Sequence, residues 1–173
     1  MKRLVFLTIL IALVALGPPG RVPVVQAQVI CTGHARQIGL GVVGTPGDDF
    51  IDCGGSTADL IIMGLGGDDF IIGGAGSDMI MAGAGDDWVF ARGGDNIVRG
   101  GEGKDALFAG GGADWLRGGP GDDVLFGGGG DDLLFGGEDD DSLFGASGRD
   151  LCNGGGGDKD WASFSCEITV HVP

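Results

Sequence analysis

The sequence predicts an all-β protein, a solenoid in which short parallel strands stack along one axis, and three observations lead to it. A nine-residue phrase, Gly-Gly-x-Gly-x-Asp-x-U-x with U a large aliphatic residue, occurs twelve times between residues 44 and 153. Its first six positions are rich in glycine and aspartate, which permit tightly turned backbone. Its last three positions are short and apolar, as in a brief strand. A strict short period of this kind is typical of repeat architectures.

Two consecutive repeats form one coil of turn, strand, turn and strand, so twelve copies predict about six coils. We interpret Cys53 and Met63 as single extra residues between copies. Position eight is expected to form one inward-facing row, because side chains alternate between the two faces of a strand. The copies begin at residues 44, 54, 64, 73, 82, 91, 100, 109, 118, 127, 136 and 145, and position eight holds Ile51, Ile61, Ile71, Ile80, Val89, Val98, Leu107, Leu116, Leu125, Leu134, Leu143 and Cys152.

The sixth position carries the candidate metal ligands. Stacked coils lie about 4.8 Å apart, so carboxylates in register repel one another unless a cation lies between them. Ca²⁺ is the expected cation, because it takes six to eight oxygen ligands in loose geometry and accepts backbone carbonyls beside carboxylates. The odd-numbered repeats place Asp49, Asp69, Asp87, Asp105, Asp123 and Asp141 along one edge, the odd edge, and the even-numbered repeats place Asp59, Asp78, Asn96, Asp114, Asp132 and Asp150 along the other, the even edge.

This phrase resembles the RTX, or haemolysin-type, calcium-binding repeats, and the resemblance covers 110 of the 173 residues. The resemblance implies a right-handed parallel β-roll with one Ca²⁺ held between successive turns on the same edge. Five gaps on each edge then set an upper bound of ten ions. Thr57 and Asp139 replace the glycine at position four, and Asn96 lacks a charge, so the gaps beside them depart from the family pattern.

Four segments are expected along the chain. Residues 1–27 combine a basic start, a run of about a dozen apolar residues and small residues at the end, which indicates a secretory signal peptide cleaved after Ala27. A retained membrane anchor is the alternative interpretation. Residues 28–43 are expected to form an N-terminal cap, residues 44–153 the repeat roll, and residues 154–173 a C-terminal cap, because the exposed ends of a solenoid need covering.

Four cysteines in a secreted chain predict two disulfides. The ends of a six-coil stack are too far apart for a disulfide, so we expect Cys31–Cys53 near the first coil and Cys152–Cys166 at the last. Thiol catalysis or zinc binding is the competing interpretation. It is disfavoured because the sequence has no CxxC pair and an oxidising compartment favours disulfides.

Charge and motif content exclude several classes of function. The chain carries 25 acidic and 10 basic residues, for a net charge of −15, and such an acidic protein repels the phosphates of nucleic acid. The sequence contains no HExxH or GxSxG motif, and the aspartate rows suit metal ligation better than acid-base chemistry, so we expect no enzymatic activity. His34 and His171 have no partner pattern and are interpreted as surface residues.

Position nine of the odd repeats stacks Phe90, Phe108, Phe126 and Phe144 on one outer face. Such a ladder stabilises neighbouring strands by itself, yet a contiguous apolar surface often marks a contact with a partner. The expected function is therefore a secreted, non-catalytic calcium-binding protein whose β-roll folds on binding Ca²⁺. The alternative is an extracellular adhesin or matrix protein that presents the aromatic face for self-association or surface adhesion.

Overall fold

The computed structural model describes residues 28–30, 40–163 and 165–170. The predicted signal peptide in residues 1–27, Cys31 and the two histidines lie outside this part of the chain. No helix occurs among the described residues, and none of their segments is a helix that could cross a membrane. The all-β prediction is therefore confirmed.

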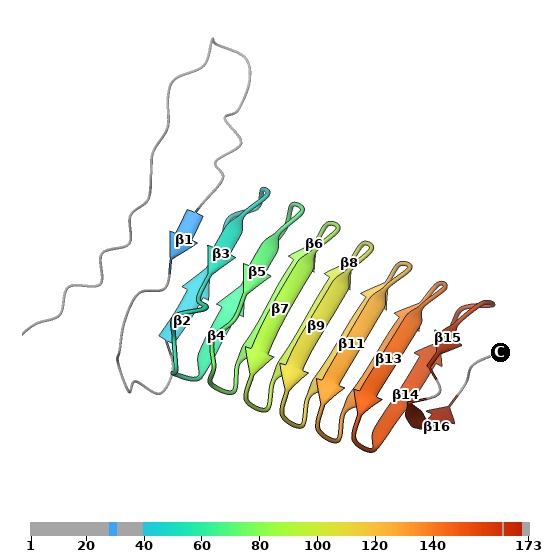
Figure 1. The fold of residues 1–173 in the computed structure, drawn as a ribbon. Coiled ribbons are helices and arrows are strands. Elements are labelled where there is room, and N and C mark those ends of the chain that lie inside the picture. The colour runs from blue at the N-terminus through green and yellow to red at the C-terminus, as the bar shows by residue number, and fades with distance from the viewer. Residues whose placement is uncertain (1–27, 31–39, 164, 171–173) are drawn as a thin grey trace, which may run out of the picture.

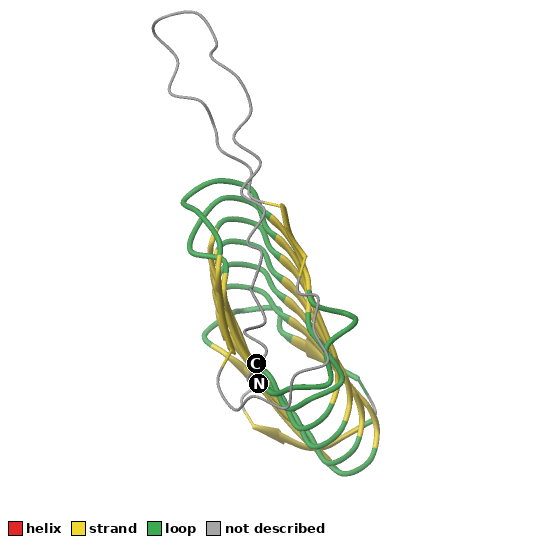
Figure 2. Cartoon of the chain, turned by 90° about the vertical axis from the view of Figure 1, so that its left-hand side faces the viewer, coloured by secondary structure: helices red, strands yellow, loops and turns green. Residues whose placement is uncertain are grey.

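The strands alternate between two parallel sheets that face each other across the roll (Figure 1; Figure 2). Each turn of backbone leads from a strand of one sheet into a strand of the other. Sheet A contains β1 (Gln28–Ile30), β3 (Phe50–Asp52), β5 (Phe70–Ile72), β7 (Trp88–Gly93), β9 (Ala106–Gly111), β11 (Val124–Gly129), β13 (Ser142–Ser147) and β15 (Trp161–Ala162). Sheet B contains β2 (Leu40–Val43), β4 (Leu60–Met63), β6 (Met79–Ala84), β8 (Ile97–Glu102), β10 (Trp115–Pro120), β12 (Leu133–Glu138), β14 (Asp150–Gly155) and β16 (Cys166–Val170).

The roll is longer than the six coils expected from the repeats alone, because each sheet has eight strands. The additional strands come from the flanking segments. β1 and β2 extend the two sheets at the N-terminal end, and β15 and β16 extend them at the C-terminal end. Both flanks thus continue the parallel stacking, and their role as caps stays a prediction.

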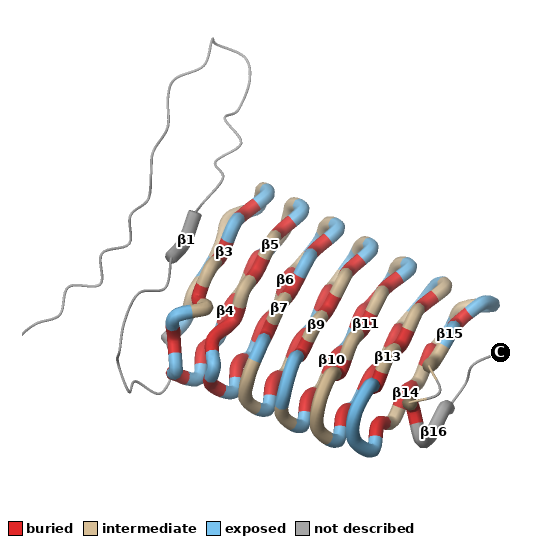
Figure 3. The backbone as a smooth tube through the Cα atoms, viewed as in Figure 1, coloured by how far each residue is buried: buried red, intermediate tan, exposed pale blue. Residues whose placement is uncertain are grey.

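The core is a narrow column between the sheets. Position eight is fully buried, as in Leu107, Leu125 and Leu143, and the following position one is small, as in Ala91 and Ala109. Figure 3 shows the result as buried residues that alternate with intermediate or exposed ones along the strands. Because each strand contributes only one large side chain and one small one, the core is continuous but thin.

The prediction for the second repeat was wrong in register. Ile61 is 40% exposed, whereas Ile62 is fully buried and pairs with Ile80. Cys53 is buried at position one, and the two extra residues lie together after it, at Gly54–Gly55, where the amide of Ser56 donates a hydrogen bond of 2.8 Å to the carbonyl of Cys53. Both insertions therefore fall in one turn, at the edge of the roll, and the residues after them shift by one position.

The predicted disulfide Cys152–Cys166 is confirmed, with the two Cα atoms 5.7 Å apart. It joins the last full strand of sheet B, β14, to the terminal strand β16. Cys53 is also disulfide-bonded. Its expected partner, Cys31, lies outside the described residues, so that pairing remains a prediction.

Candidate metal centre

At both edges the turns of successive coils pack closely on one another, with carbonyl oxygens of one turn against glycines of the next. Gly101 and Gly103, at positions two and four, have φ angles of +139° and +125°. A Cβ atom at Gly101 would lie 1.7 Å from the carbonyl oxygen of Gly83, and one at Gly103 would lie 2.1 Å from that of Gly85. Carbonyl oxygens of one coil therefore face the glycines of the next, and a side chain at these positions would block them.

The aspartates at position six form a hydrogen-bonded ladder along each edge. The amide of Asp105 donates a bond of 2.8 Å to Oδ1 of Asp123 in the next coil, and the amide of Asp123 donates one of 2.9 Å to Oδ1 of Asp141. On the even edge, the amide of Asp132 donates a bond of 3.0 Å to Oδ1 of Asp150. These bonds hold each carboxylate in a fixed orientation, with one oxygen used by the backbone.

The second carboxylate oxygen of most members of the ladder is buried without a hydrogen-bond partner. Buried acceptors are normally paired, because leaving one unpaired costs about 1–3 kcal/mol. An unpartnered oxygen that recurs at the same position in nine repeats indicates that a positive or donor group belongs there. The unpaired atoms are Oδ2 of Asp69, Asp87, Asp105, Asp114, Asp123, Asp132, Asp141, Asp150 and Asp160.

Asn96 shows what kind of group can pair with the atoms at the place of the unpartnered Oδ2. Its Oδ1 accepts a 2.9 Å bond from the amide of Asp78, as an aspartate would, so its Nδ2 occupies the place of the orphan oxygen. Nδ2 then donates a 2.9 Å bond to the carbonyl of Gly94 at position four of its own turn. In the aspartate repeats, an acceptor oxygen replaces this nitrogen, so the side chain offers no donor to the corresponding carbonyl oxygen, and Oδ2 itself has no donor. A cation is one group that can satisfy both.

Burial raises the pKa of eight carboxyl groups of the ladder. The ordinary value is 3.8, and removal of the charged form from water is the largest cause of each rise, with repulsion from neighbouring carboxylates adding to it and backbone hydrogen bonds opposing it. The pKa is also raised for Asp78 and Asp114. The raised values are about 6 for Asp69, Asp105 and Asp132, about 7 for Asp87 and Asp141, and about 8 for Asp123.

A second row of side chains lies outside the ladder, at position five. Here the direction of the hydrogen bonds is reversed, since the amide of Asp86 donates to Oδ1 of Asp68 in the preceding coil. These side chains are exposed, and Asp122 in this row forms an ion pair of 2.6 Å with Lys104 that lowers its pKa. The position-five row therefore needs no metal to balance its charge.

The structure places eleven of the twelve predicted ligands in the buried ladder and moves one out of it. Asp59 is exposed at position five, where its Oδ1 accepts a bond from the amide of Ser77. Leu60 takes position six instead, and its amide donates to Oδ1 of Asp78. The cause is the shift after Gly54–Gly55, which also puts Ala58, and not Thr57, at position four opposite Gly76.

The sequence prediction missed one member of the odd edge. Asp160 is buried, and its Oδ1 accepts a 2.9 Å bond from the amide of Asp141. It follows Asp141 by 19 residues and not by the regular 18, because the last turn contains one extra residue. The run Gly154 to Gly157 was the available signal, and allowing one inserted residue would have found it.

The remaining departures lie at the N-terminal end of each edge. Oδ2 of Asp49 accepts a bond from the amide of Thr45, and Oδ2 of Asp78 accepts one of 2.7 Å from the amide of Gly74. Oδ2 of each of these two carboxylates is therefore paired within its own turn, and Oδ1 of Asp78 also accepts the amide of Leu60 from the preceding coil. Their gaps differ from the regular ones further along the roll.

The donor set defines the kind of ion that would fit. Among the described residues, no three His, Cys, Asp or Glu side chains come together as a metal-binding group. Any ion between two turns must therefore be held by backbone carbonyls together with one or two carboxylates. An all-oxygen set of this kind suits Ca²⁺ and disfavours zinc, which prefers nitrogen and sulfur ligands.

The fold and the edges define a parallel β-solenoid with repeated oxygen-lined turns. A family model described as RTX calcium-binding nonapeptide repeat (4 copies) matches residues 54–89, 72–107, 82–116, 99–134, 108–143 and 126–158. Because these matches together cover more than half of the chain, the protein belongs to the family of RTX calcium-binding nonapeptide repeats. Among curated proteins, none matches the chain.

The pKa values predict how the metal-free roll responds to pH. A carboxyl group with a raised pKa binds its proton more tightly in the folded state than in the unfolded chain. Stability is therefore highest below pH 3.8 and is lost as pH rises through the folded-state values of about 6 to 8. Urea unfolding of the calcium-free protein at pH 4.5 and pH 8.5 measures this difference. A calcium-free roll that is equally stable at both values, or more stable at pH 8.5, contradicts it.

Proposed function

We propose that this protein is a secreted, non-catalytic calcium-binding protein whose β-roll folds when Ca²⁺ fills the gaps between its turns. The observation that carries the proposal is the row of buried Oδ2 atoms without partners, in turns where glycines pack against the carbonyl oxygens of the preceding coil. The chain is strongly acidic, so bound cations would also relieve its overall repulsion. Binding free energy would then contribute directly to folding.

The ladder sets the proposed number and location of ions. On the odd edge, seven aspartates from Asp49 to Asp160 enclose six gaps. On the even edge, four gaps lie between Asp78 and Asp150, two of them bordered by the uncharged Asn96. The upper bound of ten ions is retained, but one site moves from the start of the even edge to the end of the odd edge.

Extracellular conditions fit this role. The disulfide Cys152–Cys166 is typical of an oxidising compartment, and millimolar calcium outside cells suits weak oxygen-rich sites. Proteins with these repeats are generally secreted, and the repeats are typically structural and not catalytic. The predicted cleavage after Ala27 belongs to the same proposal.

A calcium titration followed by circular dichroism tests the proposal. The chain lacking residues 1–27 is expected to gain its β-sheet signal as Ca²⁺ rises to millimolar concentration, while Mg²⁺ is expected to produce little, because it demands rigid octahedral geometry. Asp132→Asn should raise the calcium concentration at the midpoint by roughly three- to tenfold.

Asp59→Asn is the matched control, since it removes the same charge from the same edge but at position five. Its midpoint should remain close to that of the unmodified chain. Equal effects of the two substitutions would show that general charge, and not the ladder, controls binding. A β-sheet signal that appears equally with Mg²⁺ would also reject the proposed site.

The aromatic face of sheet A supports a second candidate function, adhesion or self-association. Rings of Phe90, Phe108, Phe126 and Phe144 stack in register with centroids 4.8, 5.0 and 4.2 Å apart. Trp161 continues the stack at 4.9 Å from Phe144, and it is 48% exposed. The aromatic stack thus extends along most of the length of the roll and leaves apolar side chains in contact with water.

Charge introduced into this face tests the second candidate. Phe108→Glu/Phe126→Glu should abolish retention on a phenyl-substituted matrix in saturating calcium and remove any dimer seen by sedimentation, because two charges would interrupt the exposed stack. Met79→Glu/Leu133→Glu places the same charges on exposed residues of sheet B as a control. Retention and oligomeric state that are equal in the two double variants would reject adhesion through sheet A.

A further inference from the structure

The methionines of the chain gather at one place on the outer face of sheet B. The sequence contains four methionines, and those other than Met1 are Met63 on β4 and Met79 and Met81 on β6. Met63 and Met81 pair in register on neighbouring strands. Met79 lies two residues before Met81, so both side chains are on the same side of the sheet. Three thioether side chains therefore share one small area of the surface.

These side chains lie outside the core. Ile62 and Ile80, which pair with each other between the methionines, are fully buried. Met79 is 40% exposed, and Met63 and Met81 are partly exposed. A ligand can therefore reach this place from solvent, and the packing between the two sheets does not require sulfur there.

The neighbours of the methionines in the sheet supply hydrocarbon on most sides. Met79 lies in register between Ile61 and Ile97, and Met63 lies beside Val43. Arg99 is the neighbour of Met81 on β8, and its guanidinium lies over the ring of Trp115 on β10, 5.3 Å from the ring centroid. None of the residues paired with the three methionines carries a carboxylate.

Acidic groups lie at the nearby turn. Asp59 and Asp95, both exposed at position five, line a hollow together with Met79. Neither carboxylate belongs to the ion pairs found among the described residues. Their negative charge favours a cation near Met79, while the methionines themselves offer only sulfur.

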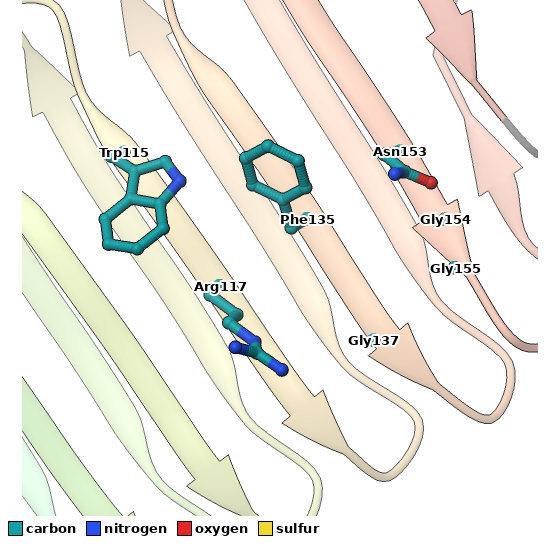
Figure 4. A pocket seen from close by; sticks show the side chains of 7 residues that line it. All are labelled: Trp115, Arg117, Phe135, Gly137, Asn153, Gly154 and Gly155. Atoms are coloured by element: carbon teal, nitrogen blue, oxygen red, sulfur yellow. The ribbon is translucent and has the colours of Figure 1, made fainter.

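The other half of the same face has a different composition. The two rows that contain Met79 and Met81 continue into Trp115, Arg117, Phe135 and Asn153 on β10, β12 and β14 (Figure 4). Aromatic, charged and amide side chains thus occupy the positions that correspond to the methionines. The sulfur atoms are confined to β4 and β6, and this confinement defines a single site.

Thioether sulfur is a soft ligand that favours copper(I) over hard cations such as Ca²⁺ and Mg²⁺. Neighbouring strands lie about 4.8 Å apart, and same-side residues of one strand lie about 6.6 Å apart. Methionine has three rotatable bonds in its side chain, so three sulfur atoms at these spacings can turn toward one ion. All cysteines of the described chain are in disulfides, so none offers a competing thiolate.

We propose that Met63, Met79 and Met81 bind one copper(I) ion through their sulfur atoms. The roll then separates two kinds of cation by ligand chemistry, because its edges present oxygen and this part of sheet B presents sulfur. The site requires the folded sheet, but it does not depend on which ion fills the edges.

Competition with bicinchoninate for copper(I), kept reduced by ascorbate, tests the proposal on the full chain in saturating calcium. Met63→Leu/Met79→Leu/Met81→Leu removes the sulfur and keeps an apolar side chain of similar volume, so the roll should remain folded by circular dichroism. Its affinity for copper(I) should fall at least about tenfold. Its calcium midpoint should remain that of the unmodified chain, which separates this site from the proposed calcium sites.

Ile61→Leu/Ile97→Leu is the matched control, since it changes the same face without removing sulfur, and it should alter copper(I) affinity less than about twofold. His34→Gln/His171→Gln should also bind copper(I) as the unmodified chain does. X-ray absorption at the copper edge is expected to show sulfur neighbours that disappear in the triple variant. The proposal is overturned if the full chain does not compete with bicinchoninate, if the triple variant binds equally well, or if the bound copper has only nitrogen and oxygen neighbours.

Discussion

Buried carboxylates that lack a positive partner are the constraint on which the rest of this structure depends. Most repeats place an aspartate at position six, fix its Oδ1 with a backbone amide and leave Oδ2 buried without a hydrogen-bond partner. Asn96 shows the uncharged solution, in which a side-chain amide donates to the carbonyl of Gly94. Nine repeats keep a carboxylate whose Oδ2 has no partner, so they need either a proton or a cation at the same place. Ca²⁺ fits because it accepts carbonyl and carboxylate oxygens together.

The same constraint explains why the remaining parts of the roll are arranged as they are. The core contains one large aliphatic side chain per strand, so apolar burial alone is modest for a chain with 40 glycines, each of which loses much conformational freedom on folding. The disulfide Cys152–Cys166 secures the C-terminal end, where the ladder on the even edge stops at Asp150. On the outer faces, the aromatic ladder of sheet A adds contacts between coils that do not involve metal.

Most of the fold and of the candidate site could be predicted from the sequence, because both follow from one period. A residue such as Leu125 or Asp123 recurs at a fixed place in the phrase, and the place decides whether it faces the core or the edge. The prediction was wrong where the period is interrupted. The turn can accommodate the two inserted residues Gly54–Gly55 without disturbing the strands. The sequence therefore does not show where the insertion lies, or that Leu60 and not Asp59 occupies position six of the ladder.

Other features depend on three-dimensional contacts that the period does not contain. Asp160 joins the odd edge across one inserted residue because its hydrogen bond to the amide of Asp141 can still form. Four non-glycine residues of the described chain adopt positive φ at positions two and four, Leu65, Arg92, Asp139 and Ala146. Their presence shows that the stacked turns impose this conformation even where the glycine of the phrase is missing.

Hydrogen exchange of the mature chain, compared in a strong chelator and in saturating calcium, is the most direct measurement of whether cations hold the ladder together. Without metal, the amides of the position-six aspartates are expected to exchange at rates close to those of an unfolded chain, because at neutral pH folding would have to bury charged carboxylates or force them to bind protons. With calcium, the same amides should become strongly protected along both edges. Protection that is equally strong in the chelator, with no metal bound, would contradict the account.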